Sequence, residues 1–242
     1  IDSYTERLIR DAVKEKMFKK TENQRIRDEI LLILKERFPL NALKRMKELH
    51  ELRFIHGKIV LNKGMEKTFK TCSEIYPWYN ENYPRKRNID LYLMYLMVLT
   101  DGLNLKQIKD LCAKFVFKRN ERIRLIAYKK NCRNIISALS SRTRFSASRI
   151  YKILEPVSYE AILVILAKTK TRRLKRRIYD FLEKYNGTKI KVRGDDLKKM
   201  GLKEGPHFKD ILTKILYAKL DGKVRTKKEE LAYLRGLIRG IR

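Results

Sequence analysis

The chain has 242 residues, of which 43% are hydrophobic, a proportion that supports a folded core and excludes disorder along most of the length. The 59 Lys and Arg residues outnumber 28 Asp and Glu residues, which gives a formal charge of +31. Such a charge repels itself in a compact state and therefore favours a polyanionic partner. Because the charge is spread along the chain, nucleic acid fits better than a membrane surface. A thermophile surface is the alternative explanation, although it normally gains both signs of charge.

The cysteines and the apolar runs exclude two further classes. Cys72, Cys112 and Cys132 include no CxxC pair, so no zinc site is predicted. No secretory signal precedes them, and we expect buried, reduced thiols in a cytoplasmic protein. The longest apolar runs, such as Leu91–Leu99, are too short to span a bilayer.

Helical periodicity dominates the first sixty residues. The segment Ser3–Lys16 places its apolar residues on one side. Thr21 and Gln24 have the spacing of a capping box, which predicts the start of a second helix. That helix should end before Pro39, which suits the first turn of a third helix. The stretch Phe54–Leu61 is expected to be extended.

The middle of the chain combines a predicted loop with a predicted central helix. A helix over Lys63–Tyr76 is expected to end at an aromatic loop broken by Pro77 and Pro84. The apolar stretch Ile89–Leu99 predicts a buried helix. Asn104 is then expected to cap the next helix.

A long basic helix is predicted over Asn120–Leu139, and short helices fill the rest of the chain. Their expected ranges are Ser146–Leu154, Ser158–Lys168, Thr171–Tyr185, Asp195–Met200, Pro206–Leu220 and Lys227–Leu237. Only Lys189–Val192 resembles a strand. The sequence therefore predicts an all-α fold, an elongated array of helices without a substantial sheet, with breaks near residues 60 and 150.

Positive charge is concentrated in the later two thirds. Residues 1–60 carry 15 basic and 10 acidic residues, residues 61–150 carry 19 and 7, and residues 151–242 carry 25 and 11. The densest basic clusters comprise Lys118, Arg119, Arg122, Arg124, Lys129, Lys130, Arg133, Arg142, Arg144, Arg149, Arg172, Arg173, Lys175, Arg176 and Arg177. Any one of these side chains is better explained as a solvated charge. Together they predict contacts with backbone phosphates, which position RNA without reading its sequence and weaken steeply with salt.

A glycine-rich corner near the C-terminus is a second candidate phosphate contact. One predicted helix ends at Gly201 and the next begins at Pro206. Glycine allows a ligand to approach the backbone, and a helix start presents unpaired N–H groups and a positive dipole end. The candidate contacts are Lys203, Gly205, Pro206, His207 and Lys209. The alternative is a simple packing corner between two helices.

Catalytic signatures are missing from this sequence. It contains no Asp-x-Asp pair for Mg²⁺, no phosphate-binding Walker loop and no nucleophile motif. The adjacent Asp195 and Asp196 are expected to cap a helix. We therefore expect no catalytic residue and no metal site in this chain.

The aromatic cluster Tyr76, Trp78, Tyr79 and Tyr83 has two interpretations. These rings could stack on unpaired bases, but packing against the core is favoured. His50 and His56 are likewise expected to be structural.

Two motifs carry a resemblance to a known family. The segment Gly194-x-Asp196-Leu197-x-x-x-Gly201-Leu202-x-x-Gly205-Pro206, followed by Leu220-Asp221-Gly222 and Glu229-Glu230-Leu231, resembles the C-terminal end of bacterial class II tRNA nucleotidyltransferases and their poly(A) polymerase relatives. The stretch Arg25-Ile-Arg-Asp-Glu-Ile30, followed by Asn41-Ala42-Leu43, is similar to the neck of these enzymes. The resemblance spans nearly the whole chain.

The resemblance implies a division into neck helices over residues 1–60, a body over 61–150 and a tail over 151–242 that grips the tRNA elbow. It implies that a catalytic head, whose motifs are not found here, supplies the aspartates and binds Mg²⁺ with ATP or CTP. Arg25, Arg27 and Glu29 match the neck helix that supports the nucleotide pocket, and the corner at Lys203 and Gly205 matches the tail loop that faces RNA. The implied function is recognition of the acceptor–TΨC arm of tRNA by shape, within an enzyme that adds A or CCA.

Three alternatives remain at this point. A poly(A) polymerase portion has a similar tail. A stand-alone RNA-binding scaffold would have the same basic helices without an enzymatic head. A helical DNA-binding protein could use the same glycine corner on duplex phosphates.

Overall fold

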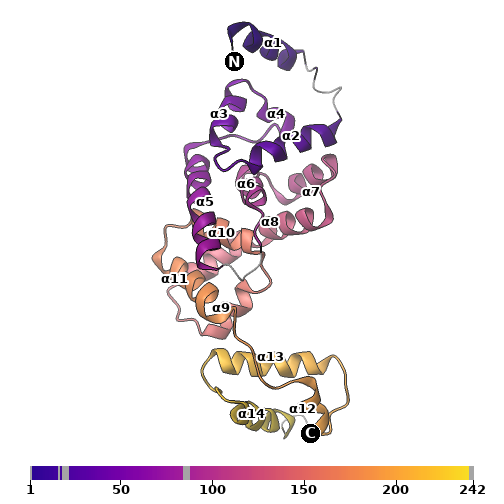
Figure 1. Cartoon of the computed structure of the whole chain (residues 1–242), viewed down its shortest axis with the longest axis vertical. Coiled ribbons are helices and arrows are strands. Elements are labelled where there is room, and N and C mark those ends of the chain that lie inside the picture. The colour runs from indigo at the N-terminus through magenta and orange to yellow at the C-terminus, as the bar shows by residue number, and fades with distance from the viewer. Residues whose placement is uncertain (1, 16, 18–21, 84–87, 240–242) are drawn as a thin grey trace. The chain divides into compact units, whose positions relative to one another are not determined.

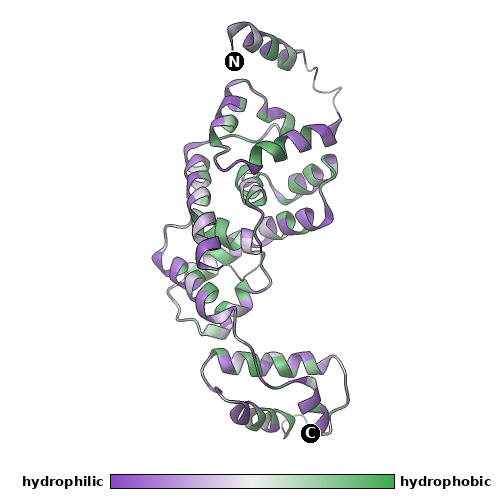
Figure 2. Cartoon of the chain, viewed as in Figure 1, coloured by the Kyte–Doolittle hydropathy of each residue, from purple (hydrophilic) through white to green (hydrophobic). Residues whose placement is uncertain are grey.

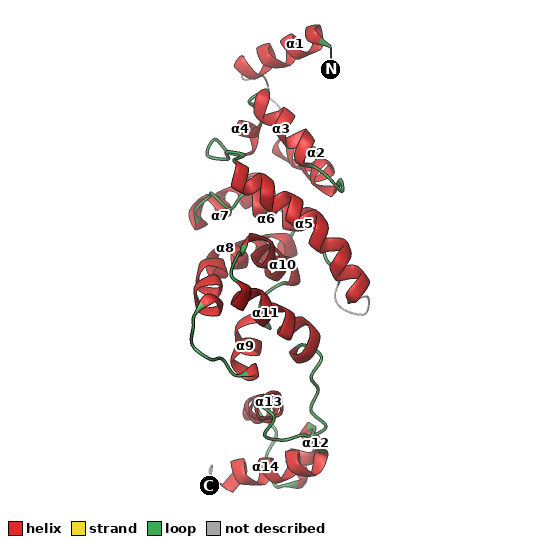
Figure 3. Cartoon of the chain, turned by 90° about the vertical axis from the view of Figure 1, so that its left-hand side faces the viewer, coloured by secondary structure: helices red, strands yellow, loops and turns green. Residues whose placement is uncertain are grey.

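The computed structural model describes residues 2–15, 17, 22–83 and 88–239, and every regular element in these ranges is helical (Figures 1 and 3). The predicted all-α class is therefore confirmed. The chain forms two compact units. The first unit comprises Ile1–Ala138 and Val157–Lys170, and the second comprises Leu139–Pro156 and Thr171–Arg242. The division into neck, body and tail stays a prediction.

Apart from α4 and the end of α5, the helices of the first unit begin and end close to the predicted positions. They are α1 (Ser3–Lys14), α2 (Asn23–Lys35), α3 (Leu40–Glu48), α4 (Leu52–Ile55), α5 (Lys63–Asn82), α6 (Leu91–Leu99), α7 (Leu105–Lys114), most of α8 (Arg119–Ser140) and α10 (Tyr159–Lys168). The short α4 occupies part of the stretch that we expected to be extended. Thr21, half of the predicted capping box, lies outside the described residues, as does Pro84.

Two apolar helices form the centre of the first unit. In α6 every residue from Leu93 to Leu99 is buried, and in α10 every residue from Tyr159 to Leu166 is buried. The ribbon of α10 is accordingly largely green in Figure 2. Helix α10 packs against α5 and α6, and α2 packs against α6. Burial on all sides explains why neither central helix shows a polar face.

The predicted break at Pro77 is wrong, because α5 runs without interruption from Lys63 to Asn82. Proline in a helix interior removes one backbone hydrogen bond. The aromatic residues after it pack against the core. Tyr79 is 1% exposed, and its ring lies 5.3 Å from that of Tyr83 and 5.9 Å from that of Tyr159. We attribute the continuity of the helix to this packing, which offsets the local propensity.

A partly buried charged network joins three segments of the first unit. The guanidinium of Arg124 binds Glu160 at 2.6 Å and Asp90 at 2.7 Å. Glu160 is only 3% exposed, and it also accepts the backbone N–H of Asp90. Arg124 is therefore committed to internal acidic partners, although the sequence placed it among the basic clusters.

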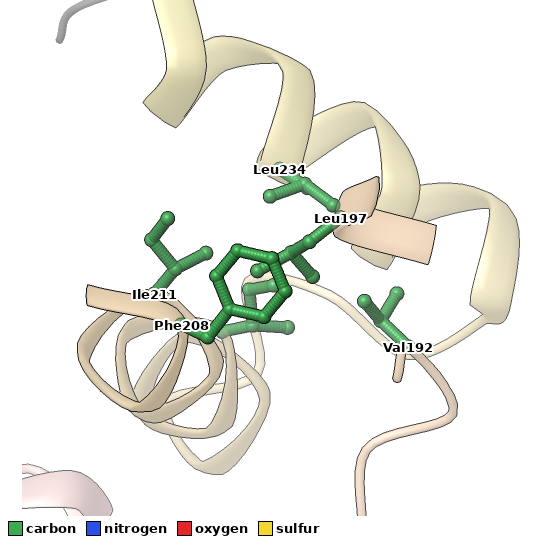
Figure 4. Close-up of a cluster of buried hydrophobic side chains, with 6 residues drawn as sticks. Val192, Leu197, Phe208, Ile211 and Leu234 are labelled. Carbon is green, nitrogen blue, oxygen red and sulfur yellow. The ribbon is translucent and has the colours of Figure 1, made fainter. Parts of the chain in front are cut away.

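The second unit contains the remaining helices. They are α9 (Ala147–Leu154), α11 (Arg172–Asp180), the π-helical turn η2 (Phe181–Tyr185), α12 (Gly194–Lys199), α13 (His207–Leu220) and α14 (Lys227–Arg239). Its C-terminal core, shown in Figure 4, gathers apolar side chains from α12, α13, α14 and the segment before α12. Its buried members are Val192, Leu197, Phe208, Ile211, Ile215 and Leu234. Helix α13 also packs against α9.

The segment Lys189–Val192, which resembled a strand in the sequence, is irregular, and no strand partner lies beside it in the described part of the chain. A buried carboxylate satisfies its backbone instead. Glu230 is 0% exposed and accepts the N–H groups of Lys191 at 2.7 Å and Val192 at 3.0 Å. The other carboxylate oxygen of Glu230 binds Lys219 at 2.7 Å.

Candidate nucleic-acid interface

Four arginines line one hollow on the second unit. The hollow has a volume of about 470 Å³ and is formed by Arg142, Thr171, Arg172, Arg173 and Arg176. We call it the arginine hollow. All four arginines are exposed, and in the described part of the chain none of them forms an ion pair. An uncompensated group of guanidinium groups favours an anion with several oxygen atoms, such as a phosphate.

The local sequence explains why the cations gather at this point. Helix α11 buries Leu174 and Ile178, which turns its first arginines outward. Arg176 stands four residues after Arg172 and three after Arg173, so the three arginines share a face of the helix. The positive end of the helix dipole adds to their field. The structure thus brings together predicted RNA contacts from α11 and from the segment after α8.

Arg177 has a different environment from its neighbours on α11. It is 8% exposed, and its guanidinium donates to three backbone carbonyl oxygens at and just after the C-terminal end of α8. The acceptors are Leu139, Ser141 and Thr143. The same guanidinium lies 4.3 Å from the centre of the Phe145 ring. Because its hydrogen-bonding capacity is directed inward, we assign Arg177 a supporting position rather than a phosphate contact.

The basic residues of α8 form a stripe on the first unit. Arg119, Arg122, Lys130 and Arg133 are exposed and stand three, eight and three residues apart. With 3.6 residues per turn, these spacings place all four on one side of the helix. Lys129 does not belong to this stripe, because its Nζ donates to the carbonyl oxygen of Asp101 at 2.6 Å. Burial lowers the pKa of Lys129.

The glycine corner is open to solvent at its two lysines and its histidine. Lys203, His207 and Lys209 are exposed, and Gly205 is partly exposed. Two backbone bonds close the end of α12, from Gly201 N–H to the Lys198 carbonyl and from Leu202 N–H to the Leu197 carbonyl. This pattern is a Schellman motif, and Gly201 has the left-handed φ of 84° that the motif requires. A side chain at Gly205 would meet only the His207 ring, at 3.0 Å.

The three predicted neck residues separate into two groups. Arg25 and Glu29 line a groove of about 560 Å³ with apolar side chains of α2, α3 and α4. Arg27 instead donates to the carbonyl oxygens of Phe115 and Val116 at the end of α7, at 3.0 and 2.9 Å. Cationic donors suit such a helix C-terminus. Support of a nucleotide pocket stays a prediction for all three residues.

The described residues include no cluster of three His, Cys, Asp or Glu side chains placed to hold a metal ion. Asp196 accepts the N–H of Arg193 at 2.8 Å and so caps α12, as predicted. The three cysteines are buried and unpaired, and burial raises the pKa of Cys72 to about 12 and that of Cys112 to about 11. At neutral pH these thiols are protonated and poorly nucleophilic.

Across the described ranges, no helix has both the length and the apolar content needed to cross a bilayer.

Known proteins resemble this chain in sequence and fold. The A-adding tRNA nucleotidyltransferase of Geobacter sulfurreducens is 29% identical over 235 residues, which are 96% of this chain and 27% of that protein. A solved CCA-adding enzyme in complex with CTP is 27% identical, with a TM-score of 0.78 over 98% of this chain and 56% of that one. The Thermotoga maritima CCA-adding enzyme complexed with tRNA is 25% identical, with a TM-score of 0.75 over 98% of this chain and 57% of that one. No family model matches the chain.

The helical fold and these similarities confirm the resemblance to tRNA nucleotidyltransferases that the sequence predicted. The chain spans about a quarter of the curated relative and just over half of the solved chains. The relatives it resembles are an A-adding enzyme and CCA-adding enzymes, and the similarity is to a part of each.

Proposed function

We propose that this chain is the RNA-binding portion of a tRNA nucleotidyltransferase that adds A or CCA to the 3′ end of tRNA. The observation that carries the proposal is the arginine hollow, in which Arg142 and three arginines of α11 converge without acidic partners. One relative was solved with tRNA bound, which supports tRNA as the polyanion.

The proposed mechanism for this chain is positioning. The arginine hollow, the α8 stripe and the cations of the glycine corner would contact backbone phosphates of the acceptor–TΨC arm and so recognise its shape. A catalytic head would supply the carboxylates that hold Mg²⁺ and would bind ATP or CTP. These three groups of residues would orient the RNA so that its 3′ end reaches that head.

A binding assay tests the proposal. A minihelix of the acceptor–TΨC arm is titrated against a single-stranded RNA and a DNA duplex of matched length, at several salt concentrations. We expect preference for the minihelix, and a loss of roughly 10³-fold between about 50 and 200 mM salt if six or more phosphates are contacted. Absence of salt-sensitive minihelix binding would overturn the proposal. Preference for single-stranded RNA would favour a poly(A) polymerase portion instead.

Charge-matched variants locate the interface. The variant R172A/R173A/R176A removes three exposed cations at the hollow, and K152A/K189A/K228A removes three exposed cations elsewhere in the second unit. We expect the first variant to lose affinity and salt dependence, and the second to retain most of both. Equal losses would show that net charge, rather than the hollow, governs binding.

A further inference from the structure

The arginine hollow is assembled from two segments that are distant in the sequence. Helix α11 supplies Arg172, Arg173 and Arg176, whereas Arg142 comes from the segment between α8 and α9. Residues 141–146 of that segment have no regular secondary structure. Arg142 therefore needs something other than a helix or a sheet to hold it opposite α11.

The contacts of Arg177 meet this need. Its Nη1 lies 2.8 Å from the carbonyl oxygen of Leu139 and 3.0 Å from that of Ser141, and its Nη2 donates to that of Thr143. The last two acceptors flank Arg142 directly in the chain. Because Arg177 lies one residue after Arg176, the helix that carries three members of the hollow also holds the backbone around the fourth.

An aromatic ring completes the arrangement. The guanidinium of Arg177 lies 4.3 Å from the centre of the Phe145 ring, and that of Arg149 lies 4.0 Å from the same centre. Cation–aromatic contacts of this kind fix the plane of a guanidinium group. A lysine could not reproduce the arrangement, since its ammonium group lacks both the planar fork of donors and the stacking surface.

The electrostatics point to a ligand. Burial lowers the pKa of Arg177, and the nearby charges of Arg173 and Arg149 lower it further. The like charges of Arg149, Arg173 and Arg177 repel one another, so the folded chain holds these cations together at a cost in free energy. An anion with several oxygens would relieve the repulsion.

We propose that Arg177 is a positioning residue that fixes Arg142 opposite Arg172, Arg173 and Arg176, so that the hollow receives a phosphate group of an RNA backbone. This inference rests on the proposed function and adds the phosphate site and the residue that organises it. Arg177 acts through the loop and does not touch the ligand.

Double-mutant analysis of minihelix binding tests the proposal. R142A is expected to weaken binding about tenfold and to lower the slope of log K against log salt by about one. R177K keeps the charge, and we expect a similar loss of affinity and slope. In R142A/R177K the losses should not multiply, because both substitutions remove the same contact. A folded R177K variant that binds like the wild type, or losses that multiply, would overturn the proposal.

Two controls separate positioning from general destabilisation. R124K alters another partly buried arginine, in the first unit, and should lower the melting temperature without changing the salt slope. F145L removes the stacking surface while retaining every arginine, and it should weaken minihelix binding. In F145L/R142A the two losses of affinity should not multiply. If R177K fails to fold, F145L decides the question, and independence of F145L from R142A rejects the proposal. If the wild type itself does not bind the minihelix, the proposed function fails rather than the positioning role alone.

Discussion

The carboxylate of Glu230 on α14 lies 3.0 Å from the backbone nitrogen of Val192, which precedes it by 38 residues. This contact joins α14 to the irregular segment before α12, and it lies beside the apolar core of Figure 4. The segment has no strand partner in the described part of the chain, so the contact replaces the hydrogen bonds that a sheet would provide.

The first prediction is that this contact makes the second unit sensitive to acid. Burial raises the pKa of Glu230, but the hydrogen bonds from Lys219 and from the backbone N–H groups of Val192 and Lys191 outweigh it and hold the pKa below its usual range. Since the folded pKa is the lower one, the stabilisation is present at neutral pH and is lost as the pH falls below about 4. E230Q should lower the free energy of unfolding at pH 7 by about 3 kcal/mol. Thermal melts between pH 7 and pH 3 check this, and parallel profiles for E230Q and the wild type would refute it.

The second prediction contrasts two arginines that are two positions apart on α8. Arg124 binds Asp90 and Glu160, whereas Arg122 is exposed on the basic stripe. R124A leaves the Glu160 carboxylate buried without its partner and should lower the free energy of unfolding by about 3 kcal/mol. R122A should leave stability within about 0.5 kcal/mol of wild type. Under the proposed function, R122A also lowers the salt slope of RNA binding. Chemical denaturation and minihelix titration measure both effects, and equal stability of the two variants would contradict the assignment.

The third prediction concerns the turn after α12. Gly201 has a φ of 84°, a conformation that costs an L-residue about 1 kcal/mol. G201A should therefore lower the free energy of unfolding by that amount, although open space surrounds the site. G102A is the matched control, because Gly102 has equal space and no positive φ. A G201A variant as stable as G102A would show that the turn relaxes without cost.

The fourth prediction assigns opposite signs to two prolines. Pro77 lies inside α5, where the missing hydrogen bond costs about 3 kcal/mol and the restricted unfolded state returns about 1 kcal/mol, so P77A should stabilise the protein by about 2 kcal/mol. Pro39 occupies the N-cap of α3, where its restricted backbone limits the unfolded state. P39A should therefore destabilise by about 0.5 kcal/mol. Urea denaturation of both variants measures the difference, and the same sign for both would reject this account.

Much of the fold follows from local patterns. Asn104 and Gln107 form the reciprocal capping box that starts α7, and Ser146 and Ser158 cap α9 and α10. These contacts span only three residues, so the sequence alone reveals them. The apolar stretch ending at Leu99 was likewise readable as a buried helix. The break predicted at Pro77 failed because the packing of Tyr79 involves α10, far away in the sequence.

The candidate site was predictable in its composition but not in its organisation. The charge pattern identified Arg142 and Arg172 as candidate phosphate contacts, but it could not show that they share one hollow. Nor could it separate Arg177, whose partners lie 34 to 38 residues away, from its exposed neighbours. Helical phase gives a partial signal, because Leu174 and Ile178 mark the buried side of α11.

Each of the two units is built from segments that are interrupted in the sequence, and this has a practical consequence. The second unit consists of Leu139–Pro156 and Thr171–Arg242. In the sequence, these two segments are separated by α10, which belongs to the first unit. A C-terminal fragment starting at Thr171 would lack α9, on which α13 packs. No single cut of the polypeptide yields both units whole, so limited proteolysis should give pieces that stay associated until denatured.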